Sequence, residues 1–287
     1  MKKIIFMIAC CLMVTAQSII AQSNYTGKVF LQHDGNITAT FGGDEIDKAI
    51  EAAVDGDILY LSKGNFNSNF TINKSISLIG SGAEAGSDSQ RSTYFEWNGS
   101  PRINGGDGKV LSAVTIEGIY SAPGFYVEGQ IENIDFKKCY FNNTLGISNN
   151  NSNGYTKKVV VDRCHLSSIS TNGSIEDATI KNCKIYNAYG QGGQTNSSCK
   201  FINCNIRQVD TNTKAMFVNS VINEVGNGTS DYLGDNAILV NTLYHNMNGY
   251  DPMEKTSQQD CWSTTETVIS NNNSDMDCTI TTEQRQT

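Results

Sequence analysis

The sequence predicts an all-β protein that folds as a single-stranded right-handed parallel β-helix with an N-terminal helical cap. Two observations predict this solenoid. A short strand pattern recurs six times along the chain, and the composition favours turns, with 26 glycines and only 3 prolines in 287 residues. Residues 1–21 are assigned to a signal peptide, residues 22–249 to the β-helix and residues 250–287 to a C-terminal capping segment.

Six segments share one template, numbered here from a small residue at position zero. In the copy around Cys183, apolar residues stand at −5, −3, +2 and +5, as Ala178, Ile180, Ile185 and Ala188. Alternation by two residues is typical of a strand with one buried face, and the odd step from −3 to zero indicates a corner between two strands. The residues at position zero are Cys139, Cys164, Cys183, Cys204, Ser220 and Thr242.

The residue before each small one is predicted to form the corner itself. It is asparagine in four copies, which tolerates left-handed backbone angles and can hydrogen-bond nearby backbone groups. The template places Thr144 at position +5 of the first copy, where the other copies have an apolar residue. The four corner asparagines are Asn182, Asn203, Asn219 and Asn241.

The copies are expected to stack, because one copy cannot bury its apolar face alone. Stacking about 4.8 Å apart predicts an inside row of free cysteines that act as small apolar fillers. A zinc site is disfavoured because these cysteines have neither close spacing nor paired histidines. Leucine-rich repeats are the competing interpretation, but they need about 20 residues or more per unit. The intervals between zero positions are 25, 19, 21, 16 and 22 residues, and two of them are too short.

Residues 44–80 predict the first coil of the solenoid. One helical face carries the apolar residues of 44–53, and strands are predicted at 58–61, 70–72 and 74–80, with a turn at 63–65. The order A-I-x-A-A, G-D-I, K-G-x-F, I-x-K-S-I and L-I-G-S-G resembles the first coils of the pectate-lyase-like right-handed parallel β-helix superfamily. The resemblance extends by pattern over about residues 40–250. It implies that the helix covers the end of the core.

The last two copies differ from the others because their outward positions are apolar. A strand that is apolar on both faces is expected to be covered on both. We expect the tail after Gly249 to cover them, held by a disulfide between Cys261 and Cys278. A second subunit is the alternative, which would give a homo-oligomer through the C-terminal rungs. The outward residues concerned are Met216, Val218, Val221, Ile238, Val240 and Leu243.

The first residues have the layout of a secretory signal peptide. Lys2 and Lys3 precede an apolar run over residues 4–14, and cleavage is expected after Ala21. Lipoprotein-type processing at Cys10 is the alternative. The protein is therefore expected to be secreted, periplasmic or at the cell surface. No transmembrane segment is expected, since no later run approaches the ~18 apolar residues that one needs.

The net negative charge of the chain limits the kinds of ligand that it is expected to bind. The chain has a net charge of −8, and loss of the two signal-peptide lysines makes it −10. An acidic protein of this kind is not expected to bind nucleic acid. Polyanionic ligands are also disfavoured unless a local basic patch or a cation intervenes.

Catalytic residues are not identified by the sequence, and whether the protein is an enzyme stays open. Nothing matches the N-T-D, D-D, G-H-G and R-I-K set of the polygalacturonases, which share the fold that the resemblance implies. The pairs Asp55 with Asp57 and Asp231 with Asp235 fit turn chemistry better than a calcium site. No cofactor and no metal are predicted.

Candidate ligand-binding residues gather on the outward positions after the corner. Tyr140, His165, Tyr186, Arg207 and His245 are expected to form one polar strip, on which aromatic faces could stack on sugars. The alternative is an ordinary solvated sheet face.

A second candidate is Trp97, in the polar insertion of residues 81–109. Such insertions often form the walls of a binding groove, although a flap packed over the coil is equally compatible. Further aromatic residues expected in loops are Tyr94, Phe95, Phe125, Tyr126 and Tyr155.

These observations favour an exported β-helix protein that binds a polysaccharide or a cell-surface glycan without catalysis. One alternative is a polysaccharide lyase or glycoside hydrolase acting on an extracellular polysaccharide. The other is a purely structural surface or adhesin module.

Overall fold

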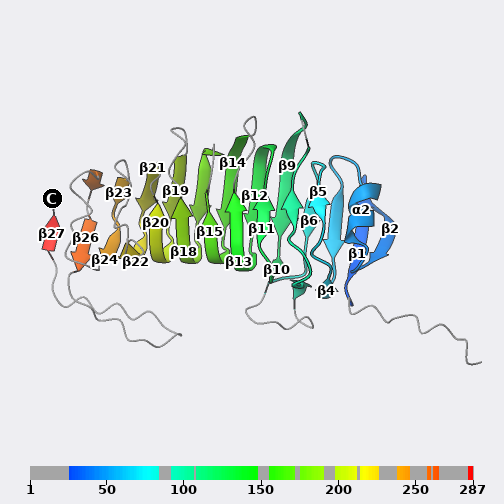
Figure 1. Ribbon diagram of the computed structural model, residues 1–287, viewed down its shortest axis with the longest axis horizontal. Coiled ribbons are helices and arrows are strands. Elements are labelled where there is room, and N and C mark those ends of the chain that lie inside the picture. Colours follow the sequence, from blue (N-terminus) through cyan, green and yellow to red (C-terminus); the bar gives the residue numbers. More distant parts are fainter. Residues whose placement is uncertain are drawn as a thin grey trace, which may run out of the picture.

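The computed structural model is an elongated stack of short strands (Figure 1). It describes residues 26–83, 92–106, 108–147, 155–171, 175–190, 198–211, 214–225, 238–245, 257–259, 261–264 and 284–286. Residues 1–21, which the sequence predicts to be a signal peptide, lie outside this described part.

Two sheets run along the stack. The 13-stranded sheet consists of β1 (Lys28–His33), β2 (Asn36–Gly42), β3 (Ile58–Leu61), β6 (Ser77–Ile79), β9 (Val110–Glu117), β12 (Gln130–Lys137), β14 (Tyr155–Asp162), β16 (Ile175–Glu176), β17 (Ala178–Lys181), β19 (Ser198–Ile202), β21 (Lys214–Val218), β23 (Ile238–Val240) and β25 (Ser257–Gln259). The 14-stranded sheet consists of β4 (Gly64–Phe66), β5 (Thr71–Ile72), β7 (Thr93–Phe95), β8 (Arg102–Ile103), β10 (Ile119–Ser121), β11 (Phe125–Val127), β13 (Tyr140–Ile147), β15 (His165–Ser170), β18 (Lys184–Gly190), β20 (Asn205–Thr211), β22 (Val221–Val225), β24 (Leu243–His245), β26 (Cys261–Thr264) and β27 (Gln284–Gln286).

Successive rungs pair in parallel and in register. For example, Ile180 pairs with Phe201, which pairs with Phe217, all at template position −3. Antiparallel pairing among the described strands occurs only at the two ends, where β1 pairs with β2 and β3, and β27 pairs with β26. The fold is therefore the all-β parallel solenoid that the sequence predicts. The β1–β2 hairpin is an addition that the template did not foresee.

The corner between the two sheets has the predicted backbone conformation. At position −1 the backbone is left-handed in every copy, with φ between 45° and 55° at Lys138, Arg163, Asn182, Asn203, Asn219 and Asn241. Asparagine side chains also pair along this corner. The Asn203 Nδ2 donates to Asn182 Oδ1 at 3.3 Å, and the Asn241 Nδ2 donates to Asn219 Oδ1 at 2.7 Å. The asparagine preference is thus explained by backbone geometry and by side-chain pairing.

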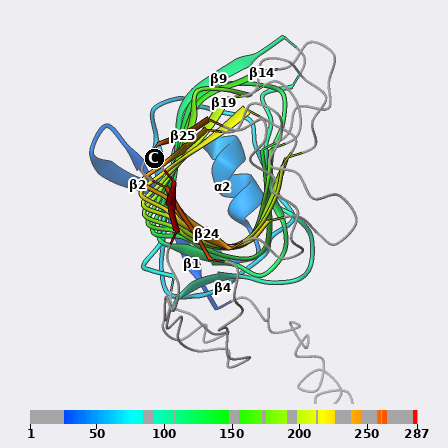
Figure 2. The ribbon, with the colours of Figure 1, turned by 90° about the vertical axis from the view of Figure 1, so that its left-hand side faces the viewer.

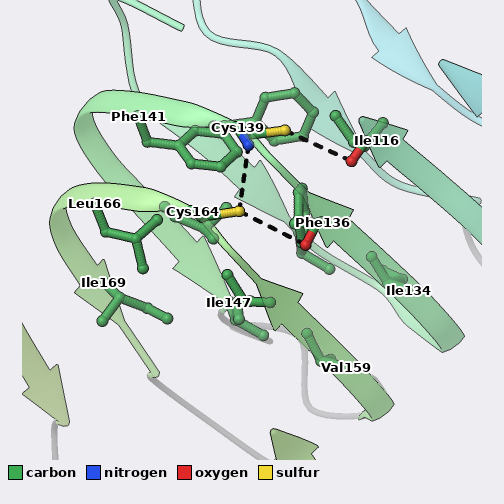
Figure 3. Close-up of a cluster of buried hydrophobic side chains, with 14 of the residues drawn as sticks. Ile116, Ile134, Phe136, Cys139, Phe141, Ile147, Val159, Cys164, Leu166 and Ile169 are labelled. Atoms are coloured by element: carbon green, nitrogen blue, oxygen red, sulfur yellow. Dashed lines mark hydrogen bonds between the residues drawn. The ribbon is translucent and has the colours of Figure 1, made fainter. Parts of the chain in front are cut away.

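The small residues at position zero point inward and lie over one another, as predicted. The four cysteines are between 2% and 3% exposed. In Figure 3 the Cys139 backbone N–H donates to Cys164 Sγ, and both thiols donate to carbonyls on the preceding rung. These side chains therefore do more than fill space, because they also satisfy buried backbone groups at the corner.

A second bend lies at position −6, and the sequence template missed it. Ala113, Asn133, Lys158 and Asp177 have φ between 49° and 62° there, inside or just before strands of the 13-stranded sheet. No single residue type marks this column, so the repeat carried no signal for it.

One template position in the first copy was wrong. Strand β13 has a register shift between Phe141 and Thr144, so that Leu145 pairs with Ile169. Leu145 is fully buried, whereas Thr144 is partly exposed. The extra residue of this bulge moved the apolar side chain by one place. The predicted turn at 63–65 was also wrong in part, because strand β4 begins at Gly64.

Helix α2 (Ile46–Ala52) closes the N-terminal end of the core. Its buried residues are Ile46, Ala49 and Ile50. Viewed along the solenoid, the helix lies within the outline of the strands (Figure 2). The Lys74 Nζ donates to the carbonyls of Ile50, Glu51 and Ala53 at 2.9, 2.6 and 2.6 Å. One ammonium therefore satisfies carbonyls that the helix C-terminus leaves without intrahelical partners.

The described parts of residues 250–287 continue the solenoid. Strand β25 pairs in parallel with β23, and β26 pairs in parallel with β24. Cys261 lies in β26, whereas Cys278 and the side chain of Cys261 lie outside the described part. The outward apolar residues of the last two copies stay partly exposed, and Ile238 is 37% exposed.

Candidate functional site

An unbroken stack of aromatic rings lies on the outer face of the 14-stranded sheet. Tyr94, Tyr120, Tyr140 and His165 contribute one ring each from successive rungs. The ring centroids are 5.0, 4.8 and 4.3 Å apart, and the planes differ by 21°, 12° and 12°. This spacing is the strand separation of a sheet, so register alone places the rings face to face.

The stack is partly removed from water. Burial, together with the neighbouring tyrosines, raises the pKa of Tyr120 to about 12. Burial also raises the pKa of Tyr94, and Glu96 adds to this effect. At the other end, burial lowers the pKa of His165, and the adjacent Lys184 ammonium lowers it further. The neutral forms of Tyr94, Tyr120 and His165 are therefore favoured in the stack.

Only two of the four stacked rings were predicted from the sequence to lie on one strip. Tyr140 and His165 were predicted on one outward strip, and the structure brings them together. Tyr94 was expected in a loop, but it lies in β7, and Tyr120 was not singled out. Their rungs do not fit the six-copy template, because position zero at Ile119 is large. The sequence signal that could have revealed Tyr120 is its place directly after the corner at Ile119, as Tyr140 follows Cys139.

A second aromatic contact lies on the same face at template position +3, two residues further along the strand than the stacked rings at +1. The Arg207 guanidinium lies 4.1 Å from the centroid of the Tyr186 ring. Tyr186 is 48% exposed and follows Lys184 by two residues on β18. On the other side of Tyr186 lies Ser167, between the register pairs Leu166–Ile185 and Ser168–Asn187.

Tyr186 therefore has one ring face covered and one face towards a small residue. Among the described residues, no other ring or cation is stacked on it. A half-exposed aromatic face beside a serine hydroxyl is suited to packing against the apolar face of a sugar ring. The prediction that Tyr186 and Arg207 share a surface with Tyr140 and His165 is consistent with this register.

Trp97 and His245 are not brought to this place by described contacts. Trp97 is 63% exposed and follows β7, four rungs before Tyr186, which corresponds to about 19 Å at the strand spacing. His245 lies at the end of β24, and its side chain is outside the described part.

Five aromatic residues expected in loops lie in strands. Phe95 and Phe125 are fully buried core residues, and Tyr155 begins β14. Tyr126 lies in β11 with its ring against Gly146, where an added Cβ would be 2.6 Å from the ring. The Arg102 guanidinium lies 5.4 Å from the same ring. Both faces of Tyr126 are therefore occupied, unlike those of Tyr186.

The aspartate pair near the N-terminal cap is used in turns. Asp57 is 5% exposed, accepts from the Val54 N–H at 2.9 Å and lies 2.7 Å from His33 Nδ1. Asp55 accepts from the Ser75 N–H at 2.7 Å. These contacts agree with the turn interpretation of this pair. Asp231 and Asp235 lie outside the described residues.

The inside cysteines are free and buried. Hydrogen bonding with Cys164 and burial raise the pKa of Cys183 to about 12, and burial raises that of Cys199 to about 11. The five cysteines whose side chains are described are free thiols: Cys139, Cys164, Cys183, Cys199 and Cys204. Within the same ranges, no three His, Cys, Asp or Glu side chains are grouped as a metal site. None of the helices there has the length and apolar character needed to cross a membrane.

Comparison with known proteins adds no relative. No protein-family model, curated protein or solved structure matches the chain. The assignment of the solenoid therefore depends on strand register, buried ladders and corner geometry.

Proposed function

We propose that this is an exported, non-catalytic glycan-binding protein whose ligand lies on the outer face of the 14-stranded sheet. The observation that carries the proposal is the half-exposed Tyr186 ring, covered on one side by Arg207 and facing Ser167 on the other. A sugar stacked over Ser167 would contact the uncovered ring face.

The surroundings supply polar partners for such a sugar. Lys184 is exposed beside Tyr186, and Asn205 follows Lys184 in the same outward column. The partly exposed Tyr140 and Tyr94 of the aromatic stack continue the face towards the N-terminus. Amide, hydroxyl and ammonium groups around an aromatic platform are the usual composition of a small-molecule site. An elongated face of this kind is suited to an extended chain of sugars more than to a single one.

Two wider statements belong to the same proposal. The motifs of residues 49–82 support membership of the pectate-lyase-like superfamily, and the basic and apolar start supports export. The partner is accordingly an extracellular polysaccharide or a cell-surface glycan. The proposal includes no catalytic residue.

Binding to a panel of soluble polysaccharides, measured by affinity electrophoresis and titration calorimetry, tests this proposal. We expect Tyr186→Ala to weaken binding about five- to thirtyfold, because an aromatic platform contributes roughly 1–2 kcal/mol. Ser167→Tyr is expected to block the same face. The matched control is Tyr60→Ala, because Tyr60 is 36% exposed but lies on the other sheet.

The same samples distinguish the alternative functions. New reducing ends or unsaturated products would identify a hydrolase or a lyase and overturn the non-catalytic proposal. Absence of binding to every polysaccharide would favour a structural or adhesin module. Equal loss of binding in the Tyr186 and Tyr60 variants would place the ligand elsewhere.

A further inference from the structure

The outward column of the aromatic stack brings two basic groups, His165 and Lys184, next to each other. His165 pairs in register with Lys184 on the next rung, so their side chains leave the same face about 4.8 Å apart. Lys184 is exposed, and His165 is partly buried against Tyr140. Arg207 follows on the rung after Lys184 and is also exposed.

The charged and titratable groups around His165 are few. Tyr140 faces it from β13, and Lys184 faces it from β18. On its own side of the corner, Arg163 is held by Asp162, with both guanidinium contacts at 3.1 Å. At outward positions +1 and +3 of the described rungs from β10 to β22, no residue is a carboxylate. These two outward columns are therefore locally basic, although the chain has a net charge of −8.

We propose that His165 and Lys184 form a proton-dependent anion site for a carboxylate or sulfate group carried by a bound glycan. This inference rests on the proposed function, because a sugar over Ser167 would place its substituents beside both side chains. Ser167 follows His165 by two residues on β15, and Tyr186 follows Lys184 by two residues on β18.

Binding and protonation are linked in this arrangement. In the free protein, burial and Lys184 favour the neutral imidazole. An anion placed between the two groups favours the imidazolium, so a proton moves from the buffer to the ring nitrogen when the anion binds. The face of Tyr140 further stabilises the imidazolium through a cation–π contact. Affinity for an anionic glycan must therefore rise as the pH falls.

Titration calorimetry at about pH 5.5 and about pH 7.5 tests the inference. An acidic oligosaccharide and its neutral counterpart are compared in buffers of different ionisation enthalpy. We expect the acidic ligand to bind about three- to tenfold more tightly at the lower pH, with uptake of at most one proton. The neutral ligand is expected to show no uptake.

Variants locate the proton. His165→Phe keeps a ring against Tyr140 but cannot titrate, so proton uptake should vanish. Lys184→Gln should weaken binding of the acidic ligand at both pH values. The control is His33→Asn, which removes another histidine, on the 13-stranded sheet, and should leave the uptake unchanged.

The outcomes separate this inference from the proposed function. Binding of the acidic oligosaccharide with no pH dependence, or uptake that persists in His165→Phe, overturns the proton-dependent site and leaves glycan binding intact. Failure of both ligands to bind at either pH overturns the proposed function itself. Uptake with free sulfate or acetate alone would show that the sugar does not place the anion, and it would overturn the glycan-linked form of the site.

Discussion

The backbone N–H of Cys164 donates a hydrogen bond to Cys183 Sγ, one rung further along the solenoid, over 3.4 Å. The thiol of Cys183 in turn donates to the Val161 carbonyl at 3.5 Å. The buried corner amides of Cys139, Cys164 and Cys204 each donate to the γ atom of the next rung. Ser220 and Thr242 make the same carbonyl contacts through their hydroxyls. The position accepts the residue types that carry a polar γ atom.

The first prediction concerns this γ atom. We expect Cys183→Val to lower the free energy of unfolding by about 1–3 kcal/mol, because the Cys164 amide loses its acceptor in a buried site. Cys183→Ser is expected to be the more stable of the two variants, since the hydroxyl can replace the thiol. Urea unfolding followed by circular dichroism measures both. Greater stability of the valine variant would show that packing alone determines this position.

Thiol reactivity gives a second prediction. Cys139, Cys164, Cys183, Cys199 and Cys204 are buried, and those with resolved shifts have raised pKa values. The thiolate is the reactive form of cysteine. We therefore expect none of the five to be alkylated in the folded protein at about pH 8 or below. All five should react in urea. Mass spectrometry of the peptides assigns each site, and rapid native labelling of any of the five would contradict the inside row.

The cap of helix α2 gives a third prediction. Lys74→Met removes three charge-assisted hydrogen bonds to helix carbonyls, and we expect a loss of about 1–3 kcal/mol of unfolding free energy. Lys63→Met is the control, because Lys63 is exposed in the turn before β4. Urea unfolding compares the two variants. Equal midpoints would mean that the ammonium contributes nothing to the cap.

The corner backbone gives a fourth prediction. Asn203 has a φ of 53°, a conformation that a β-branched residue adopts only at a cost of about 1–2 kcal/mol. We therefore expect Asn203→Val to be destabilised by at least that amount, while Asn203→Gly loses only its side-chain contact with Asn182. Thermal and urea midpoints of the two variants provide the test. A valine variant as stable as the glycine variant would exclude backbone strain as the reason for asparagine.

The pH dependence of stability gives a fifth prediction. The pKa of His165 is lowered in the folded state, first by burial and then by Lys184. Its contribution is therefore present above the unfolded pKa of about 6.5 and decreases as the pH falls through that value. His33 has the opposite sign, because hydrogen bonding to Asp57 raises its pKa, so its contribution decreases as the pH rises above about 6.5.

The two histidines can be separated by substitution. We expect His165→Phe to lose the fall in stability below about pH 6.5, and His33→Asn to lose the fall above it. Unfolding free energies measured between about pH 5 and pH 8 test both signs. An unchanged acid limb in His165→Phe would mean that the stacked imidazole is not the group that titrates.

The sequence alone determined the repeat, the corners and the inside row. Few backbone conformations bury apolar residues two apart together with a small residue three places later. Each corner also has an asparagine, as at Asn182, or a cysteine, as at Cys183. The helix of residues 44–53 was equally visible, since its apolar face has helical period. These features depend on local geometry, which a single rung already expresses.

Tertiary structure alone decided which outward residues meet. Tyr120 stacks on Tyr94 and Tyr140 because three strands far apart in sequence are in register, and the bulge near Thr144 shifted one rung by a residue. The pairing of Tyr186 with Arg207 has the same origin. Inward positions are fixed by the need to exclude water, whereas outward ones are free in type. Their contacts therefore depend on register between rungs, which loop lengths and bulges set.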